Sequence, residues 1–97
     1  MKLPTFDEFK QAALAEGFDA VLERDWAAGQ HVASHSHPFS VKALVVRGGL
    51  TLTVGEAVTH LQAGDPFTLE RDTLHVEQYG PEGATFWVGR KNPPIGS

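Results

Sequence analysis

The sequence predicts a small all-β fold, a barrel or sandwich of short strands preceded by one α-helix. From Phe18 onward, apolar and polar residues alternate in short runs, which is the period of half-buried strands. Residues that favour turns, mainly Gly, Pro and Asp, separate these runs at regular spacing. The chain has 97 residues, which is the length of one domain with one hydrophobic core.

A short helix is expected before the strands. Thr5 and Glu8 have the spacing of a capping box, in which each side chain accepts a hydrogen bond from the other residue's backbone. Good helix formers continue to about Glu16, and Gly17 is a stop signal. The apolar stripe is narrow and consists of Phe6, Phe9 and Ala13. The helix should therefore lie outside a larger body or across a dimer interface.

About eight strands are expected after the helix. They cover residues 18–23, 31–37, 41–47, 50–54, 57–61, 67–69, 74–79 and 84–90. Gly48-Gly49 is interpreted as a hairpin turn, and the stretch 80–83 as a further turn. We therefore divide the chain into an N-terminal helix (1–17), a β-barrel (18–91) and a flexible tail (92–97), because Pro93-Pro94 cannot continue a strand.

Composition excludes several classes of partner and cofactor. The formal net charge is −4, and the eight Lys and Arg residues are scattered, so no nucleic-acid surface is expected. No apolar run approaches the ~18 residues of a membrane span, and the N-terminus lacks the pattern of a signal peptide. We expect a cytoplasmic protein without membrane contact. Because there is no cysteine, a bound metal must have nitrogen or oxygen ligands.

Three histidines have the spacing of a metal site. His35 and His37 are two residues apart, so both point to the same face if the segment is a strand. His75 lies in another alternating run, Leu74 to Tyr79. Three imidazoles from two strands would form a facial set that leaves coordination positions open, as a catalytic site requires.

These residues resemble the two motifs of the cupin family. The first motif is matched by Gly29, His35, His37 and Gly48, and Val41 stands where the family has a glutamate. The second is matched by Gly64 and His75, whereas its Pro, Gly and Asn positions hold Glu70, Asp72 and Tyr79. The resemblance covers more than half of the chain, from about Gly29 to Tyr79.

The resemblance implies a small single-domain (RmlC-like) cupin. Its fold would be a double-stranded β-helix, or jelly-roll barrel, with a short N-terminal α-helix and with His35, His37 and His75 pointing into the mouth. It also implies one divalent metal ion on these three histidines. Imidazole ligands without a carboxylate suit Zn, Ni, Fe or Cu better than Mn or Mg.

Glu77 and Tyr79 are the candidate catalytic residues. Both share the strand parity of His75 and should face inward. Glu77 would be an outer acceptor, a general base or a fourth ligand, and Tyr79 would offer its hydroxyl to a substrate. The alternative is that both merely face a wet barrel mouth. We interpret His31 as a rim or interior residue and His60 as a surface residue rather than as ligands.

Two functions remain open at this stage. The first is a metal-dependent protein that acts on a small oxygenated or anionic molecule, with dioxygenase-like chemistry if the metal is iron. The alternative is a non-catalytic module that binds or senses a small ligand, because cupins include both kinds. In either case a homodimer is expected, since a short barrel has an exposed sheet edge and the helix adds apolar surface.

Overall fold

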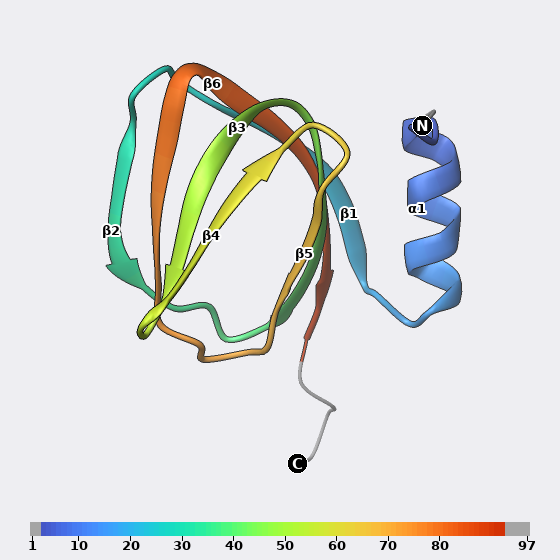
Figure 1. Cartoon of the computed structure of the whole chain (residues 1–97). Helices are drawn as coiled ribbons and strands as arrows, with labels where there is room; N and C mark the ends of the chain where they lie inside the picture. Colours follow the sequence, from blue (N-terminus) through green and yellow to red (C-terminus); the bar gives the residue numbers. More distant parts are fainter. Residues whose placement is uncertain (1–2, 93–97) are drawn as a thin grey trace.

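The computed structural model describes residues 3–92 and has the predicted all-β architecture with one N-terminal helix (Figure 1). The elements are α1 (Phe6–Ala15), β1 (Ala20–Trp26), β2 (His31–His35), β3 (Ser40–Val54), β4 (Ala57–Gln62), β5 (Pro66–Leu69) and β6 (His75–Lys91). All strand pairs are antiparallel. The predicted tail lies outside the described residues from position 93 onward.

Two long strands, β3 and β6, organise the barrel. They pair with each other along most of their length, and each passes from one layer of the barrel to the other. The first half of β3 and the second half of β6 lie between β5 and β1. The second half of β3 and the first half of β6 lie between β4 and β2. These pairings make two four-stranded layers that share β3 and β6. Figure 1 shows the strands curving around a common interior.

The prediction of a hairpin turn at Gly48-Gly49 is wrong. The backbone bends there but keeps its direction, and the register between β3 and β6 shifts on either side, between Val45 and Arg47 and between Gly48 and Leu50. The predicted turn at 80–83 likewise lies inside β6. Glycines at positive φ bend these strands as β-bulges do, without reversing them. Residues 3–92 therefore contain six strands where eight were expected, because two pairs of predicted strands are each continuous.

Alternating residues of both layers fill the core. The buried cluster consists of Val41, Ala43, Val45, Leu50, Leu52, Leu61, Leu69, Tyr79, Ala84, Phe86 and Val88. Partly buried aromatic residues, among them Trp26, Phe39 and Phe67, pack against it. Burial of these apolar side chains is the main favourable contribution to the stability of the barrel.

The helix lies on the outside of the barrel beside β1 and β6 (Figure 1). The predicted capping box is confirmed, because the Thr5 hydroxyl accepts from the Glu8 N–H at 3.1 Å and the Glu8 carboxylate accepts from the Thr5 N–H at 2.8 Å. Phe9 and Ala13 are buried, and the Phe9 ring lies 5.9 Å from that of Trp87. Within residues 3–92 no helix has the length and apolar character needed to cross a membrane.

The bend at Gly48 gives a first prediction. Gly48 and Gly55 both have positive φ, at 69° and 58°, but a Cβ at Gly48 would overlap the Gly83 carbonyl oxygen whereas one at Gly55 would meet no atom within 4 Å. Gly55→Ala should lower the free energy of unfolding by about 1 kcal/mol, the cost of a left-handed backbone. Gly48→Ala should lower it by about 3 kcal/mol or more, because strain and steric overlap add. Urea denaturation of both variants measures the difference, and equal losses would contradict this account of the bend.

Candidate metal centre

The first two histidines of the site come from the end of β2 and the segment after it. Strand β2 ends at His35, and its pairing with β6 becomes irregular between Val32 and His35. His37 lies in the connection to β3, so the strand on which the parity argument relied is shorter than predicted. The two imidazoles nevertheless meet, with ring centroids 4.9 Å apart.

The third histidine, His75, is the first residue of β6, and the turn before it ties it to His37. In this turn Asp72 has a left-handed backbone with φ of 64°, at the position where the cupin motif has glycine. Aspartate tolerates this conformation better than most residues. The Asp72 N–H donates to the His37 carbonyl oxygen at 2.7 Å. This backbone hydrogen bond adds to the pairing of His35 with His75 between β2 and β6 and extends the contact to His37.

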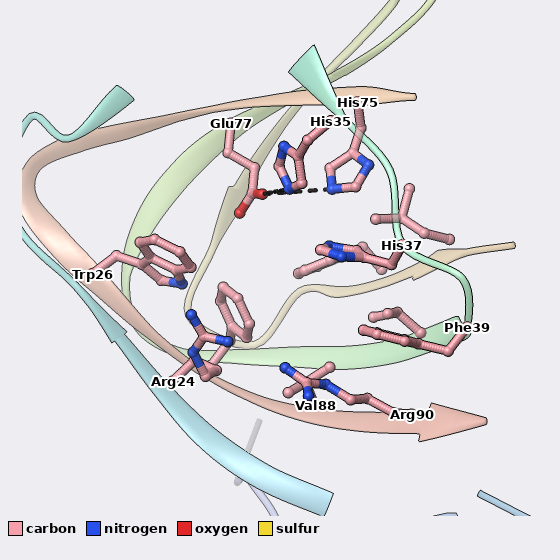
Figure 2. Close-up of a pocket in the computed structure, with 13 residues that line it drawn as sticks. Arg24, Trp26, His35, His37, Phe39, His75, Glu77, Val88 and Arg90 are labelled. Carbon is pink, nitrogen blue, oxygen red and sulfur yellow. Dashed lines mark ion pairs between the residues drawn. The ribbon is translucent and has the colours of Figure 1, made fainter. Parts of the chain in front are cut away.

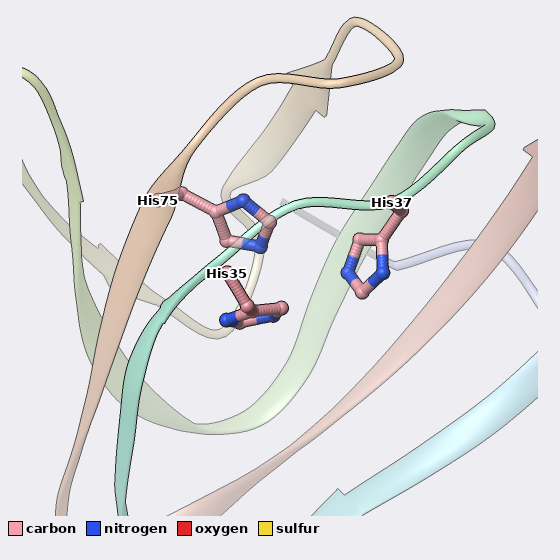
Figure 3. Close-up of side chains that lie close together, drawn as sticks. All are labelled: His35, His37 and His75. Atoms are coloured by element: carbon pink, nitrogen blue, oxygen red, sulfur yellow. The ribbon is translucent and has the colours of Figure 1, made fainter.

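The three imidazoles lie close enough to hold one ion. Each offers a ring nitrogen, and these three atoms all lie within 4.8 Å of one another. His75 is buried, whereas His35 and His37 are partly exposed. Figure 3 shows the three rings turned toward a common space from neighbouring segments of the chain. This arrangement has the character of a facial set with an open side.

The hydrogen bonds of two imidazoles determine which nitrogen is free. His35 Nδ1 lies 2.8 Å from the Ala33 carbonyl oxygen, and His75 Nδ1 lies 2.9 Å from the Thr73 carbonyl oxygen. A carbonyl oxygen only accepts, so both Nδ1 atoms must carry the proton. In the neutral ring the lone pair is then on Nε2, the form in which histidine binds metal.

Glu77 faces these same nitrogens. Its Oε2 lies 3.4 Å from His35 Nε2 and 3.5 Å from His75 Nε2, the two interactions drawn as dashed lines in Figure 2. Three acceptor atoms directed at one another repel unless a cation or a proton lies among them. Two ligands ~2.1 Å from one ion at a tetrahedral angle are ~3.4 Å apart, so the observed separations fit a shared ion.

Tyr79 holds the other oxygen of Glu77. Its hydroxyl donates to Glu77 Oε1 in a short hydrogen bond, and both side chains are buried, at 2% and 7% exposure. Burial, reinforced by the bond to Glu77, raises the pKa of Tyr79, so the hydroxyl remains a donor. Tyr79 does not line the pocket. Its position is therefore behind Glu77 rather than at the open barrel mouth.

His37 is kept neutral by its surroundings. Burial is the largest cause that lowers the pKa of His37, followed by the neighbouring imidazoles of His35 and His75. Glu77 acts in the opposite direction and Arg90 in the same direction. A neutral imidazole is the form that donates a lone pair to a metal. The donor set as a whole, imidazole nitrogen with one carboxylate nearby, fits Zn, Ni, Fe or Cu.

The histidine cluster forms one wall of a pocket with a volume of about 90 Å³. Val41, at the place of the motif glutamate, is buried and also lines this pocket. The two other histidines, His31 and His60, lie outside the cluster, as expected. Both are exposed; His31 is hydrogen-bonded to Gln78, and His60 to Thr51. The structure thus groups the histidines as the sequence interpretation does.

Two pocket residues, Arg24 and Arg90, were not identified from the sequence. They lie on β1 and near the end of β6, across the pocket from the histidines (Figure 2). Strand parity could have found Arg24, since Leu22, Arg24 and Trp26 share one face of β1 and two of them are apolar. Arg90 shares parity with the core residues Phe86 and Val88 in the same way.

Among known proteins, the chain is similar to several solved structures. No protein-family model matches the sequence, and no curated protein matches it significantly. An uncharacterized conserved protein with a double-stranded β-helix domain from Klebsiella pneumoniae is 29% identical, with a TM-score of 0.65 over 78% of this chain and 69% of that chain. An RmlC-like cupin from Shewanella frigidimarina is 21% identical, with a TM-score of 0.66 over 77% and 67%.

Drosophila melanogaster CENP-C, in a structure bound to CAL1, shares the fold as well. It is 19% identical, with a TM-score of 0.64 over 73% of this chain and 60% of that chain. The likeness to the bacterial double-stranded β-helix proteins extends over more than three quarters of the chain. With the barrel topology, it shows that the chain has the double-stranded β-helix fold of the small RmlC-like cupins.

Proposed function

We propose that this cupin binds one divalent transition-metal ion through His35, His37 and His75 and takes up a small oxygenated or anionic molecule beside it. The observation that carries the proposal is the grouping of three ring nitrogens within 4.8 Å, two of them with the proton fixed on the opposite nitrogen. Zn, Ni, Fe and Cu are the metals that this donor set favours.

An ion held by these histidines would supply Lewis-acid chemistry toward an oxygen of the ligand. Glu77 would bind the ion or accept a proton beside it, because its Oε2 faces two of the imidazoles. Tyr79 is a positioning residue, since its hydroxyl holds Glu77 Oε1 and fixes the direction of the carboxylate. The open side of the pocket is the route by which a small molecule reaches the site.

The alternative is a module that binds or senses a ligand without turnover. The likeness to CENP-C bound to CAL1 supports it, because this fold also occurs in a protein bound to another protein. The two functions differ in one observable. Protein loaded with Fe(II) and screened for oxygen uptake with diketones, catechols and thiols should consume oxygen only if it is an oxygenase. The cytoplasmic location expected from the sequence stays a prediction.

Metal binding is tested by single replacements of the ligands. His35→Ala, His37→Ala and His75→Ala should each weaken zinc binding by about tenfold or more, because two imidazoles chelate poorly. Calorimetric titration of chelator-treated protein that has never met an affinity-tag metal measures this. His60→Ala is the matched control, since His60 is exposed and outside the cluster. Equal zinc affinity in the three variants and in the control would refute the site.

Glu77 is tested by removing its charge while keeping its shape. Glu77→Gln should weaken zinc binding by about tenfold, because the carboxylate that faces two of the ring nitrogens is lost. Tyr79→Phe should weaken zinc binding less, since the carboxylate remains but loses its anchor. Glu56→Gln, on an exposed turn, is the control. Unchanged zinc affinity in Glu77→Gln would show that Glu77 does not bind the ion, and only its role as a proton acceptor would then remain.

A homodimer is the expected assembly. Strand β4 is a sheet edge whose residues are mostly exposed, and its Val58 side chain is 57% exposed. An exposed edge of this kind favours pairing with a second copy. Light scattering should give twice the chain mass of 10.5 kDa. A monomer mass that does not change with concentration would contradict the prediction.

A further inference from the structure

The pocket holds two cationic side chains that no acidic side chain neutralises. Arg24 and Arg90 both line it, and Glu77 is the one acidic residue among the lining residues. Glu77 is directed at the histidines and at Tyr79. Within residues 3–92 neither guanidinium takes part in an ion pair. The charge of the wall opposite the histidines is therefore positive even before a metal ion is bound.

Two buried donors in this wall have no acceptor among the residues that the structure describes. They are Arg90 Nε and Trp26 Nε1. Both groups can only donate, and buried donors without partners are rare in folded proteins. Both residues line the pocket. A ligand with acceptor oxygens would satisfy them, whereas a ligand made of carbon and hydrogen alone would not.

Aromatic rings hold the two guanidinium groups in place. The Arg24 guanidinium lies over the Trp26 ring at 4.9 Å, and that of Arg90 lies over the Phe39 ring at 4.8 Å. Stacking of this kind uses the faces of the guanidinium and leaves its N–H groups, which lie in its plane, free to bind an anion. The paired donors of arginine match the two oxygens of a carboxylate.

The size and walls of the pocket limit the rest of the ligand. The remaining lining side chains are apolar: Phe39, Val41, Phe67, Leu69, Phe86 and Val88. The volume of about 90 Å³ is below the ~150 Å³ of a cavity that accepts benzene. Inorganic phosphate would leave the apolar walls uncovered, whereas an acid with a short carbon skeleton would cover them.

We propose that the pocket binds a small organic carboxylate, whose carboxylate group pairs with Arg24 and Arg90 while a second oxygen points to the histidine cluster. This proposal narrows the ligand class of the proposed function, and only the contact of the second oxygen rests on the proposed metal site. The carboxylate end depends on the arginines alone. Binding at that end should therefore persist in protein without metal, and bound zinc should strengthen it.

The test measures binding of glycolate, pyruvate and 3-hydroxybutyrate, their neutral amides, and inorganic phosphate. The chain has two tryptophans, so a Trp87→Phe variant leaves pocket residue Trp26 as the fluorescent reporter. Calorimetry on the unaltered chain checks the affinities. At least one acid should bind both the metal-free and the zinc-loaded protein, and its amide should bind about tenfold or more weakly. Binding of no acid, equal binding of the amide, or tighter binding of phosphate would overturn the proposal.

Arginine variants locate the binding. Arg24→Gln and Arg90→Gln should each weaken acid binding by about tenfold, because a charged hydrogen-bonded pair is lost. Arg71→Gln removes the same charge from an exposed residue outside the pocket and should change nothing. Equal effects of all three would reduce the binding to net charge and overturn the proposal. If Arg90→Gln does not fold, Arg24→Gln and Arg90→Lys, which keeps the charge but loses the paired donors, carry the test.

Zinc titration of the same samples separates the two proposals. Acid binding by metal-free protein together with no zinc binding would refute the metal site and leave the carboxylate pocket standing. Zinc binding at the histidines with no acid bound in either form would refute the carboxylate pocket and leave the metal site standing.

Discussion

The close approach of Gly48 and Gly83 is the constraint on which the rest of this barrel depends. At that point β3 and β6 bend together and pass from one layer to the other, and no side chain fits between them. The bend lets a single strand, β6, present His75 and Glu77 in one layer and Arg90 in the other. The histidine wall and the arginine wall of the pocket face each other because this strand contributes to both.

The sequence predicted the part of the site that depends on residue type and spacing. The three histidines and the capping box of the helix were correctly grouped because each is a short pattern with one physical meaning. The strand count was wrong because Gly48-Gly49 has the same appearance in sequence whether it reverses a strand or bends it. Only the close contact with Gly83, which lies far along the chain, decides between these outcomes.

The electrostatic character of the pocket was less visible in the sequence. Arg24 and Arg90 lie at inward positions of strands, where an apolar period leads one to expect core residues. What distinguishes them is the lack of an acidic partner, which is a property of three-dimensional neighbours. The source of the carboxylate beside the histidines was not clear from the sequence either. Val41 occupies the motif position of the glutamate, but the carboxylate comes from Glu77 on another strand.

The hydrogen bonds that orient His35 and His75 have a consequence for how the site tolerates change. In both cases the acceptor is the backbone carbonyl two residues earlier, at Ala33 and Thr73. A carbonyl is present whatever side chain those positions carry, so substitutions there leave the imidazoles correctly turned. The orientation of these two rings therefore depends on the path of the backbone and not on the side chains at positions 33 and 73.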